Sequence, residues 1–249
     1  MFAVVKTTEK EKGFMSHLRK KRISSERVTL PNKECFFVIT AEMTKNIFPF
    51  EEIIRFSDRL KNNLIFESNA PVLYDSFRPA LLKKKLLFLY AEHFIQKTEY
   101  NPSGLSICIC DCNGLYCDEL YRLLPLASKI HIVSGNESYT YKAHELLSEY
   151  GMSVTIGESF DKRAEESNII ISHRSDMISV GYKGTVITNE ARSFPLARCV
   201  AVSGVSLPTH YESFLPEEID RDIFASALYE KCFCEDILQW CSEKILKSR

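Results

Sequence analysis

The sequence predicts an α/β protein whose second part is a doubly wound parallel sheet. Short apolar runs bounded by turn residues recur along residues 101–215, as buried parallel strands require. Helical patterns separate these runs at spacings that suit right-handed crossovers. A polar breaker cluster at residues 99–104 divides this part from a first region of mixed pattern.

The first domain, residues 1–100, is expected to be a smaller α+β domain. Residues 2–6 and 35–40 are apolar and rich in Val, Ile and Phe, which favours strands. Between them, residues 12–22 suit a short basic helix. Pro49 and Pro79 stand where prolines begin helices, which predicts helices over residues 50–64 and 79–96.

In the second domain, residues 101–215, the predicted elements alternate. Strands are expected over residues 105–110, 129–133, 152–156, 168–171, 185–188 and 199–202. Helices are expected over residues 118–124, 139–150 and 161–167. In the helix over 139–150 the apolar residues lie on one face, and Gly151 follows as a left-handed cap. This order predicts a Rossmann-like fold.

Two further helical stretches, residues 216–230 and 233–246, lie within a C-terminal part, residues 216–249. In a protein of two domains such a part often packs back on the first domain. We therefore expect three parts: an α+β domain, a Rossmann-like domain and C-terminal helices that could cover the first domain.

Charge and composition argue against several kinds of partner. The formal net charge is -1 and the pI about 6.6, so no global field attracts nucleic acid or an anionic membrane. No apolar run reaches the ~18 residues of a membrane span, and the apolar stretch at the start of the sequence is too short for the core of a signal peptide. We expect a cytoplasmic protein whose nine cysteines are reduced. We expect a small-molecule or nucleotide ligand and leave a homodimer open.

Ligands of an open α/β sheet bind at the carboxyl ends of its strands, so the loops there hold the candidate site. The predicted binding residues follow the first, second and fourth strands of the second domain: Asp111, Asn113, Gly114, Leu115, Ser134, Gly135, Asn136, Ser172, His173 and Arg174. No metal site is expected, because alternating cysteines on one strand cannot surround a zinc ion and no histidines have metal spacing.

The first of these loops departs from a dinucleotide-binding loop. The fingerprint G-x-G-x-x-G is absent, and Gly114 is its one glycine. The carboxylate of Asp111 would repel a phosphate unless a cation lay between them. The second loop, from Ser134 to Asn136, is small and neutral and would not exclude a ribose phosphate.

Several segments resemble a known family. Residues 131–136 (HIVSGN), 142–146 (KAHEL) and 166–172 (ESNIIIS) are similar to the NADP-binding half of the shikimate dehydrogenase and glutamyl-tRNA reductase group. Residues 28–34 (VTLPNKE) are similar to that family's Asn-Val-Thr-x-Pro-x-Lys segment, which implies Lys33 as a catalytic lysine. The resemblance implies an NADP-linked oxidoreductase. Our first hypothesis is a protein that binds a nucleotide or another phosphorylated metabolite between residues 111–116 and 134–136, with Lys33 and Arg174 facing the cleft between the domains.

The same resemblance has gaps. The family's Gly-x-Gly-Gly-Ala phosphate loop is replaced by residues 111–115 (DCNGL), and its Ser-x-Ser and Asn-Thr-Asp segments are absent. A Rossmann-shaped module that has lost its cofactor and serves binding or regulation therefore remains an alternative, and the single glycine of the loop favours it.

A third interpretation is a degenerate phosphoryl-transfer protein. Residues 107–114 (ICICDCNG) resemble the first motif of haloacid-dehalogenase-like phosphatases, and residues 132–135 (IVSG) resemble the second. In that family a second aspartate is the general acid, but Asn113 stands there and an amide cannot deliver a proton. No acidic pair follows the fourth strand.

Overall fold

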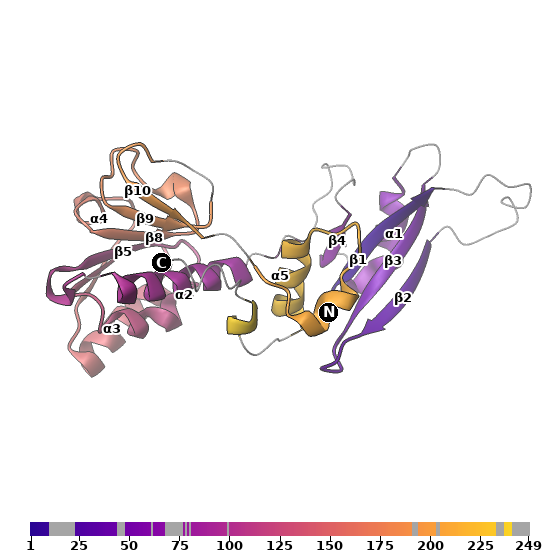
Figure 1. Cartoon of the computed structure of the whole chain (residues 1–249), viewed down its shortest axis with the longest axis horizontal. Helices are drawn as coiled ribbons and strands as arrows, with labels where there is room; N and C mark the ends of the chain where they lie inside the picture. Colours follow the sequence, from indigo (N-terminus) through magenta and orange to yellow (C-terminus); the bar gives the residue numbers. More distant parts are fainter. Residues whose placement is uncertain are drawn as a thin grey trace, which may run out of the picture. The chain divides into compact units, whose positions relative to one another are not determined.

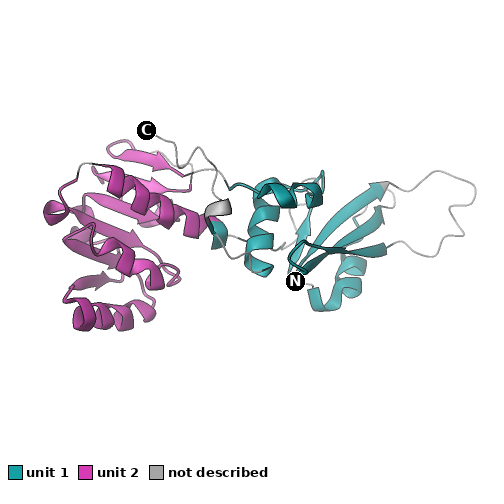
Figure 2. Ribbon diagram, turned by 60° about the horizontal axis from the view of Figure 1, so that its bottom comes forward, with its two compact units in different colours: residues 1–82, 205–240 teal, residues 83–204, 241–249 magenta. Residues whose placement is uncertain are grey.

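The structure, a computed structural model, describes residues 1–9, 23–43, 48–60, 62–67, 77, 79, 81–98, 100–190, 194–202, 205–232 and 237–240. In this part the chain forms two compact units (Figure 2). The first unit combines residues from 1–82 with residues from 205–240, and the second is built from residues 83–204. The predicted helices over 12–22 and, apart from residues 237–240, over 233–246 lie outside the described residues.

The first unit holds a four-stranded sheet in the order β2-β3-β1-β4. Strand β1 pairs in parallel with β3 and β4, and β2 pairs antiparallel with β3. The strands are β1 Ala3–Glu9, β2 Ile23–Thr29, β3 Cys35–Met43 and β4 Leu64–Phe66. The sequence patterns predicted β1 and β3 but missed β2, an edge strand whose side chains are mostly exposed.

The first half of the central strand β1 is buried on both faces, which explains its apolar sequence from Ala3 to Val5. On one face Val5 belongs to a core cluster with Ile53 of helix α1 (Phe50–Ser57). On the other face Phe2 stacks on Phe36, and both rings meet Phe224 of helix α5 (Arg221–Lys231) edge-on. The helix α5 of the C-terminal part thus packs on the sheet of the first unit.

The helix predicted over residues 50–64 is too long. Helix α1 ends at Ser57, a 3-10 turn η1 (Asp58–Leu60) follows, and residues 64–66 form β4. Parallel pairing of Leu64 with Ala3 decides this, because the sheet outweighs a helical spacing of apolar residues. The other helical elements of this unit are 3-10 turns η5 Thr209–Phe214 and η6 Ile237–Trp240.

The second unit holds six parallel strands in the order β10-β9-β8-β5-β6-β7 (Figure 1). Numbered within the unit and read from the other edge, this is the order 3-2-1-4-5-6 of the dinucleotide-binding fold. The strands are β5 Ser106–Cys110, β6 Lys129–Val133, β7 Val154–Gly157, β8 Ile169–Ser172, β9 Thr185–Thr188 and β10 Arg198–Ala201. The predicted Rossmann-like fold class is confirmed.

The connections of this unit are partly α-helical. They comprise α2 Leu81–Lys97, which begins at the division between the units, η2 Pro102–Gly104, η3 Cys117–Leu123, α3 Ser138–Tyr150, α4 Lys162–Glu165 and η4 Ser175–Met177. Helix α3 ends at Gly151 in the left-handed conformation, as predicted. The predicted α-helix over 118–124 is a 3-10 helix instead, η3, over Cys117–Leu123. No helix in the described ranges has both the length and the apolar character needed to cross a membrane.

Candidate functional site

The predicted binding residues of the second unit lie at the carboxyl edge of its sheet. Strand β5 pairs with β6 on one side and with β8 on the other, so the chain reverses its winding direction between β5 and β8. Ligands of this fold bind at such a switch point. The loops after β5, β6 and β8 carry all the predicted residues except Lys33 and Ser172, which is the last residue of β8.

The carboxylate of Asp111 organises the first loop from inside. Asp111 follows β5 and has no exposed surface. Its Oδ1 accepts the backbone N–H of Asn113 at 3.0 Å, and its Oδ2 accepts those of Leu115 at 2.6 Å and Tyr116 at 3.3 Å. The hydroxyl of Tyr139, from α3, donates to Oδ2 at 2.6 Å. These donors bind the protein's own carboxylate.

This arrangement closes the turn where a dinucleotide fold receives pyrophosphate. In that fold, free amides at the start of an α-helix approach the phosphates. Here the amides of the turn are directed to Asp111, and the segment that follows is the 3-10 helix η3 rather than an α-helix. The carboxylate of Asp111 thus accepts the hydrogen bonds that a bound anion would accept in that fold.

The second loop packs against the first. Gly114 has φ +75°, and a Cβ placed on it would lie 2.9 Å from Nδ2 of Asn136. Asn136 is fixed in turn, since its Oδ1 accepts the N–H of Ser138 at 2.9 Å and its own N–H donates to Oγ of Ser134 at 3.1 Å. Glycine at position 114 therefore serves close packing between two loops, while Gly135 has open space around it.

Burial and the neighbouring carboxylate change the acidity of two tyrosines. Desolvation raises the pKa of Tyr139 and of Tyr116, and the charge of Asp111 raises both further. Both phenols therefore stay protonated at any ordinary pH. Sequence patterns missed these two residues, because Tyr139 falls on the apolar face of its helix and its hydroxyl gives no separate signal.

The loop after β8 brings a buried histidine to the same place. His173 is 6% exposed, and its ring meets the ring of Tyr116 edge-on at a centroid distance of 6.3 Å. Desolvation lowers the pKa of His173, and Lys84 of α2 lowers it further. Within the described residues, neither Nδ1 of His173 nor the hydroxyl of Tyr116 has a hydrogen-bond partner. Two buried polar atoms thus retain bonding capacity at the switch point.

The remaining residues of this loop are engaged locally. The hydroxyl of Ser172 donates to the carbonyl of Arg174 at 2.7 Å and accepts the N–H of Arg174 at 3.1 Å. The guanidinium of Arg174 is exposed and forms a two-point pair with Asp176 at 3.0 and 2.5 Å. That pair raises the pKa of Arg174. A ligand anion would have to compete with Asp176 for the Arg174 guanidinium.

Lys33 belongs to the first unit. It lies in the turn between β2 and β3 with φ +69°, its N–H donates to the carbonyl of Leu30 at 2.9 Å, and its side chain is exposed. Its catalytic role stays a prediction. Among the described residues, no cluster of His, Cys, Asp and Glu could hold a metal ion. Asp111 is buried and fully hydrogen-bonded, which makes it unsuited to attack phosphorus.

No protein-family model matches the chain, and no curated protein matches its sequence. Among solved structures, Δ1-pyrroline-2-carboxylate reductase of Thermococcus litoralis, solved with NADH and L-proline, is 13% identical, with a TM-score of 0.34 over 49% of this chain and 37% of that one. L-Tryptophan dehydrogenase of Nostoc punctiforme is 15% identical, with a TM-score of 0.32 over 86% of this chain and 65% of that one.

The 5-ketofructose reductase of Gluconobacter sp. strain CHM43 is 13% identical, with a TM-score of 0.33 over 78% of this chain and 87% of that one. The chain therefore spans little more than a third of the length of the first of these proteins and just under two thirds of the second. The fold assignment rests on the strand order, and these similarities add nothing to it.

Proposed function

We propose that the Rossmann-like unit is a binding or regulatory module that does not take up a dinucleotide at its first turn. The observation that carries the proposal is the carboxylate of Asp111, which accepts three backbone N–H groups of the turn and the hydroxyl of Tyr139. These are the kind of donors that pyrophosphate needs.

Electrostatics also argues against a dinucleotide at the first turn. A diphosphate at this turn would meet a buried carboxylate of the same sign in surroundings of low dielectric, where like charges repel far more than in water. Asp111 has no exposed surface, so a solvent cation has no direct access to screen it. Catalysis that depends on a dinucleotide bound at this turn is disfavoured for the same reason.

The test is a calorimetric titration of the full chain with NADPH and NADH. The wild type should give no binding heat up to about 1 mM, which corresponds to a binding free energy weaker than about -4 kcal/mol. Asp111→Gly should gain NADPH binding, because it frees the amides and removes the charge. If the glycine variant fails to fold, Asp111→Asn is titrated in its place, because it removes the charge but keeps an acceptor oxygen for the turn.

Asp118→Asn is the matched control, since it removes an exposed carboxylate close to the same turn. It should leave the titration unchanged. Micromolar binding of NADPH to the wild type would overturn the proposal, and so would a folded Asp111→Gly variant that binds no better than the wild type.

A second candidate, an NADP-linked oxidoreductase, is favoured by the strand order and by the small neutral turn Ser134-Gly135-Asn136, which would not exclude a ribose phosphate. It requires wild-type binding of NADPH. It also predicts that Lys33→Ala abolishes turnover while changing the melting temperature by no more than about 2 °C, as expected for an exposed side chain.

A further inference from the structure

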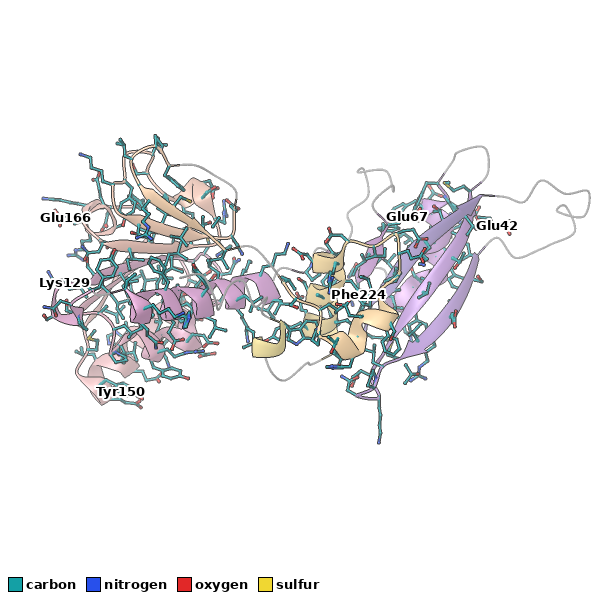
Figure 3. The ribbon with its side chains drawn as sticks, viewed as in Figure 1. Glu42, Glu67, Lys129, Tyr150, Glu166 and Phe224 are labelled. Atoms are coloured by element: carbon teal, nitrogen blue, oxygen red, sulfur yellow. The ribbon has the colours of Figure 1, made fainter. Side chains whose placement is uncertain are left out.

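A cavity of about 550 Å³ opens at the opposite edge of the second sheet, where its strands begin. Cavities of this size accommodate small metabolites. Figure 3 shows two of its residues, Lys129 and Glu166, at one end of the unit. The lining residues are Ser106, Ile107, Ser128, Lys129, Ile130, His131, Ser153, Thr155, Arg163, Glu166 and Ser167.

The cavity exists because a helix is short. One face of the sheet carries Cys110 and Val133 near the carboxyl ends of their strands, and Ala164 of α4 packs against them. Neighbours in register share a face, so Ser106, Lys129 and His131 lie on this same face nearer the start of the strands. Helix α4 has only four residues and leaves this half of the face uncovered.

The lining has two cations and few competing anions. Among the described residues, Lys129 and Arg163 form no ion pair. Glu166 pairs with Lys162 at 3.5 Å. Asp161 accepts two backbone N–H groups at the start of α4 and lies 3.1 Å from Nε2 of His131. The net local charge therefore favours an anion.

Hydroxyl groups supply the complementary chemistry. Ser128 donates its proton to the carbonyl of Leu105 at 3.2 Å, and Ser167 donates to the carbonyl of Arg163 at 2.9 Å. Because these protons are committed to the main chain, the two hydroxyl oxygens can act only as acceptors toward a ligand. They suit ligand hydroxyl groups, whereas the two cations suit an acid group.

A buried histidine fixes the floor of the cavity. His131 is 4% exposed; its Nδ1 lies 2.8 Å from Oγ1 of Thr155 and its Nε2 lies 3.1 Å from Oδ1 of Asp161. Among the described residues, Nε2 of His131 makes this contact at ion-pair distance only and has no hydrogen-bond partner.

From this lining we propose that the cavity is a second binding site, which takes a small polyhydroxylated anion, with Lys129 and Arg163 holding its acid group and Ser128 and Ser167 its hydroxyl groups. A sugar phosphate and a sugar acid share this chemistry. The site is separate from the turn at Asp111, and its existence does not depend on whether a dinucleotide binds there.

The experiment is calorimetric titration of the full chain with ribose 5-phosphate and with gluconate, alongside inorganic phosphate and uncharged ribitol. At least one of the two hydroxylated anions should bind, and phosphate and ribitol should bind about tenfold more weakly or worse, because each offers half of the contacts. Lys129→Gln and Arg163→Gln should each weaken that binding about tenfold.

Lys183→Gln is the matched control, because it removes an exposed cation of the same unit that does not line the cavity. It should leave the affinity within about twofold of the wild type. Amide resonances of Ser128 and Ser167 should shift on binding, while those of Asn113 to Tyr116 should not. The absence of binding by both hydroxylated anions, equal loss in all three variants, or equal binding of ribitol would each overturn the proposal.

Discussion

The two edges of the Rossmann-like sheet use their polar groups in opposite ways. At the carboxyl edge, the donors around Asp111 are directed inward to a carboxylate that has no exposed surface. At the opposite edge, the side chains of Lys129 and Arg163 border a cavity of about 550 Å³ without an ion partner among the described residues. The first turn, which the fold normally uses for phosphate, has its donors occupied, whereas the opposite edge holds an open cavity.

The difference teaches that strand order alone does not locate a site. Order and handedness place loops at the switch point, but whether these loops bind a ligand depends on where their donors are directed. A single carboxylate at position 111 changes the first turn from a receptor for anions into a self-contained structural turn. A four-residue α4 meanwhile uncovers part of a sheet face that a longer helix would bury.

A substitution of Asp111 tests the difference between the two edges most directly. If its carboxylate is structural, Asp111→Ala should lower the free energy of unfolding of the second unit by about 3 kcal/mol or more, because four donors, two of them in buried hydrogen bonds, lose their acceptor. Thermal unfolding followed by circular dichroism measures this. Fluorescence does not, because the single tryptophan, Trp240, belongs to the first unit.

Lys129→Ala is the corresponding change at the open edge. Its side chain is exposed, so the loss should stay within about 0.5 kcal/mol. Equal losses for the two variants would remove the distinction between a closed and an open edge.

Removing the hydroxyl of Tyr139 gives a finer test, because it takes away one donor and leaves the carboxylate of Asp111 in place. Tyr139→Phe should cost about 2 kcal/mol, the range of a hydrogen bond to a charged group. The measurement is the same thermal unfolding. Tyr141→Phe is the control on the same helix, since its side chain is 73% exposed and should be neutral. A neutral Tyr139→Phe would mean that the amides alone hold Asp111.

Gly114 tests the contact between the first and second loops. Gly114→Ala should cost about 1 kcal/mol for its left-handed backbone, and crowding against Asn136 should add to this. Asn136→Ala in the same chain should relieve only the crowding. Gly135→Ala, which has open space around it, should be close to neutral. If Asn136→Ala gives no relief, the loops are not in the close contact described.

Much of this fold was readable from the sequence, because periodicity reports burial. Strands β5, β6 and β8 are buried apolar runs, and their loops were placed correctly by counting along the chain. Strand β2 was missed because an exposed edge strand has little apolar signal. The 3-10 form of η3 was missed because its apolar spacing resembles that of an α-helix.

Only part of the candidate site could be predicted from the sequence. The sequence identified Asp111 as an obstacle to phosphate, which the structure supports, but took its effect to be repulsion alone. The bonds from the turn's amides to Asp111 are local in the sequence. The hydroxyl of Tyr139 reaches Asp111 from α3, 28 residues along the chain, and no short-range pattern encodes that contact. The cavity at the other edge was invisible for the same reason, because Lys129 and Arg163 are far apart in the chain and separately look like solvated surface residues.

The smallest expected effect compares one buried histidine at each edge. Burial lowers the pKa of His173 and of His131 below the ordinary 6.5. At pH values between the lowered folded-state pKa and 6.5, these histidines bind more protons in the unfolded chain than in the folded one. The free energy of unfolding therefore falls as the pH drops through 6.5 toward the folded-state pKa. Thermal unfolding between pH 5 and 7.5 should show this decline, and His173→Gln and His131→Gln should each reduce it.

His173 should account for the larger share. Its charged form faces Lys84 and Arg174, which oppose protonation, as well as Asp111 and Glu190, which favour it. The charged form of His131 faces Arg163, but Asp161 is only 3.1 Å away and compensates for part of the burial. A direct titration of the histidine ring protons by NMR separates the two residues. A larger effect at His131 would mean that Asp161 does not offset burial, and that the open edge is less polar than its lining indicates.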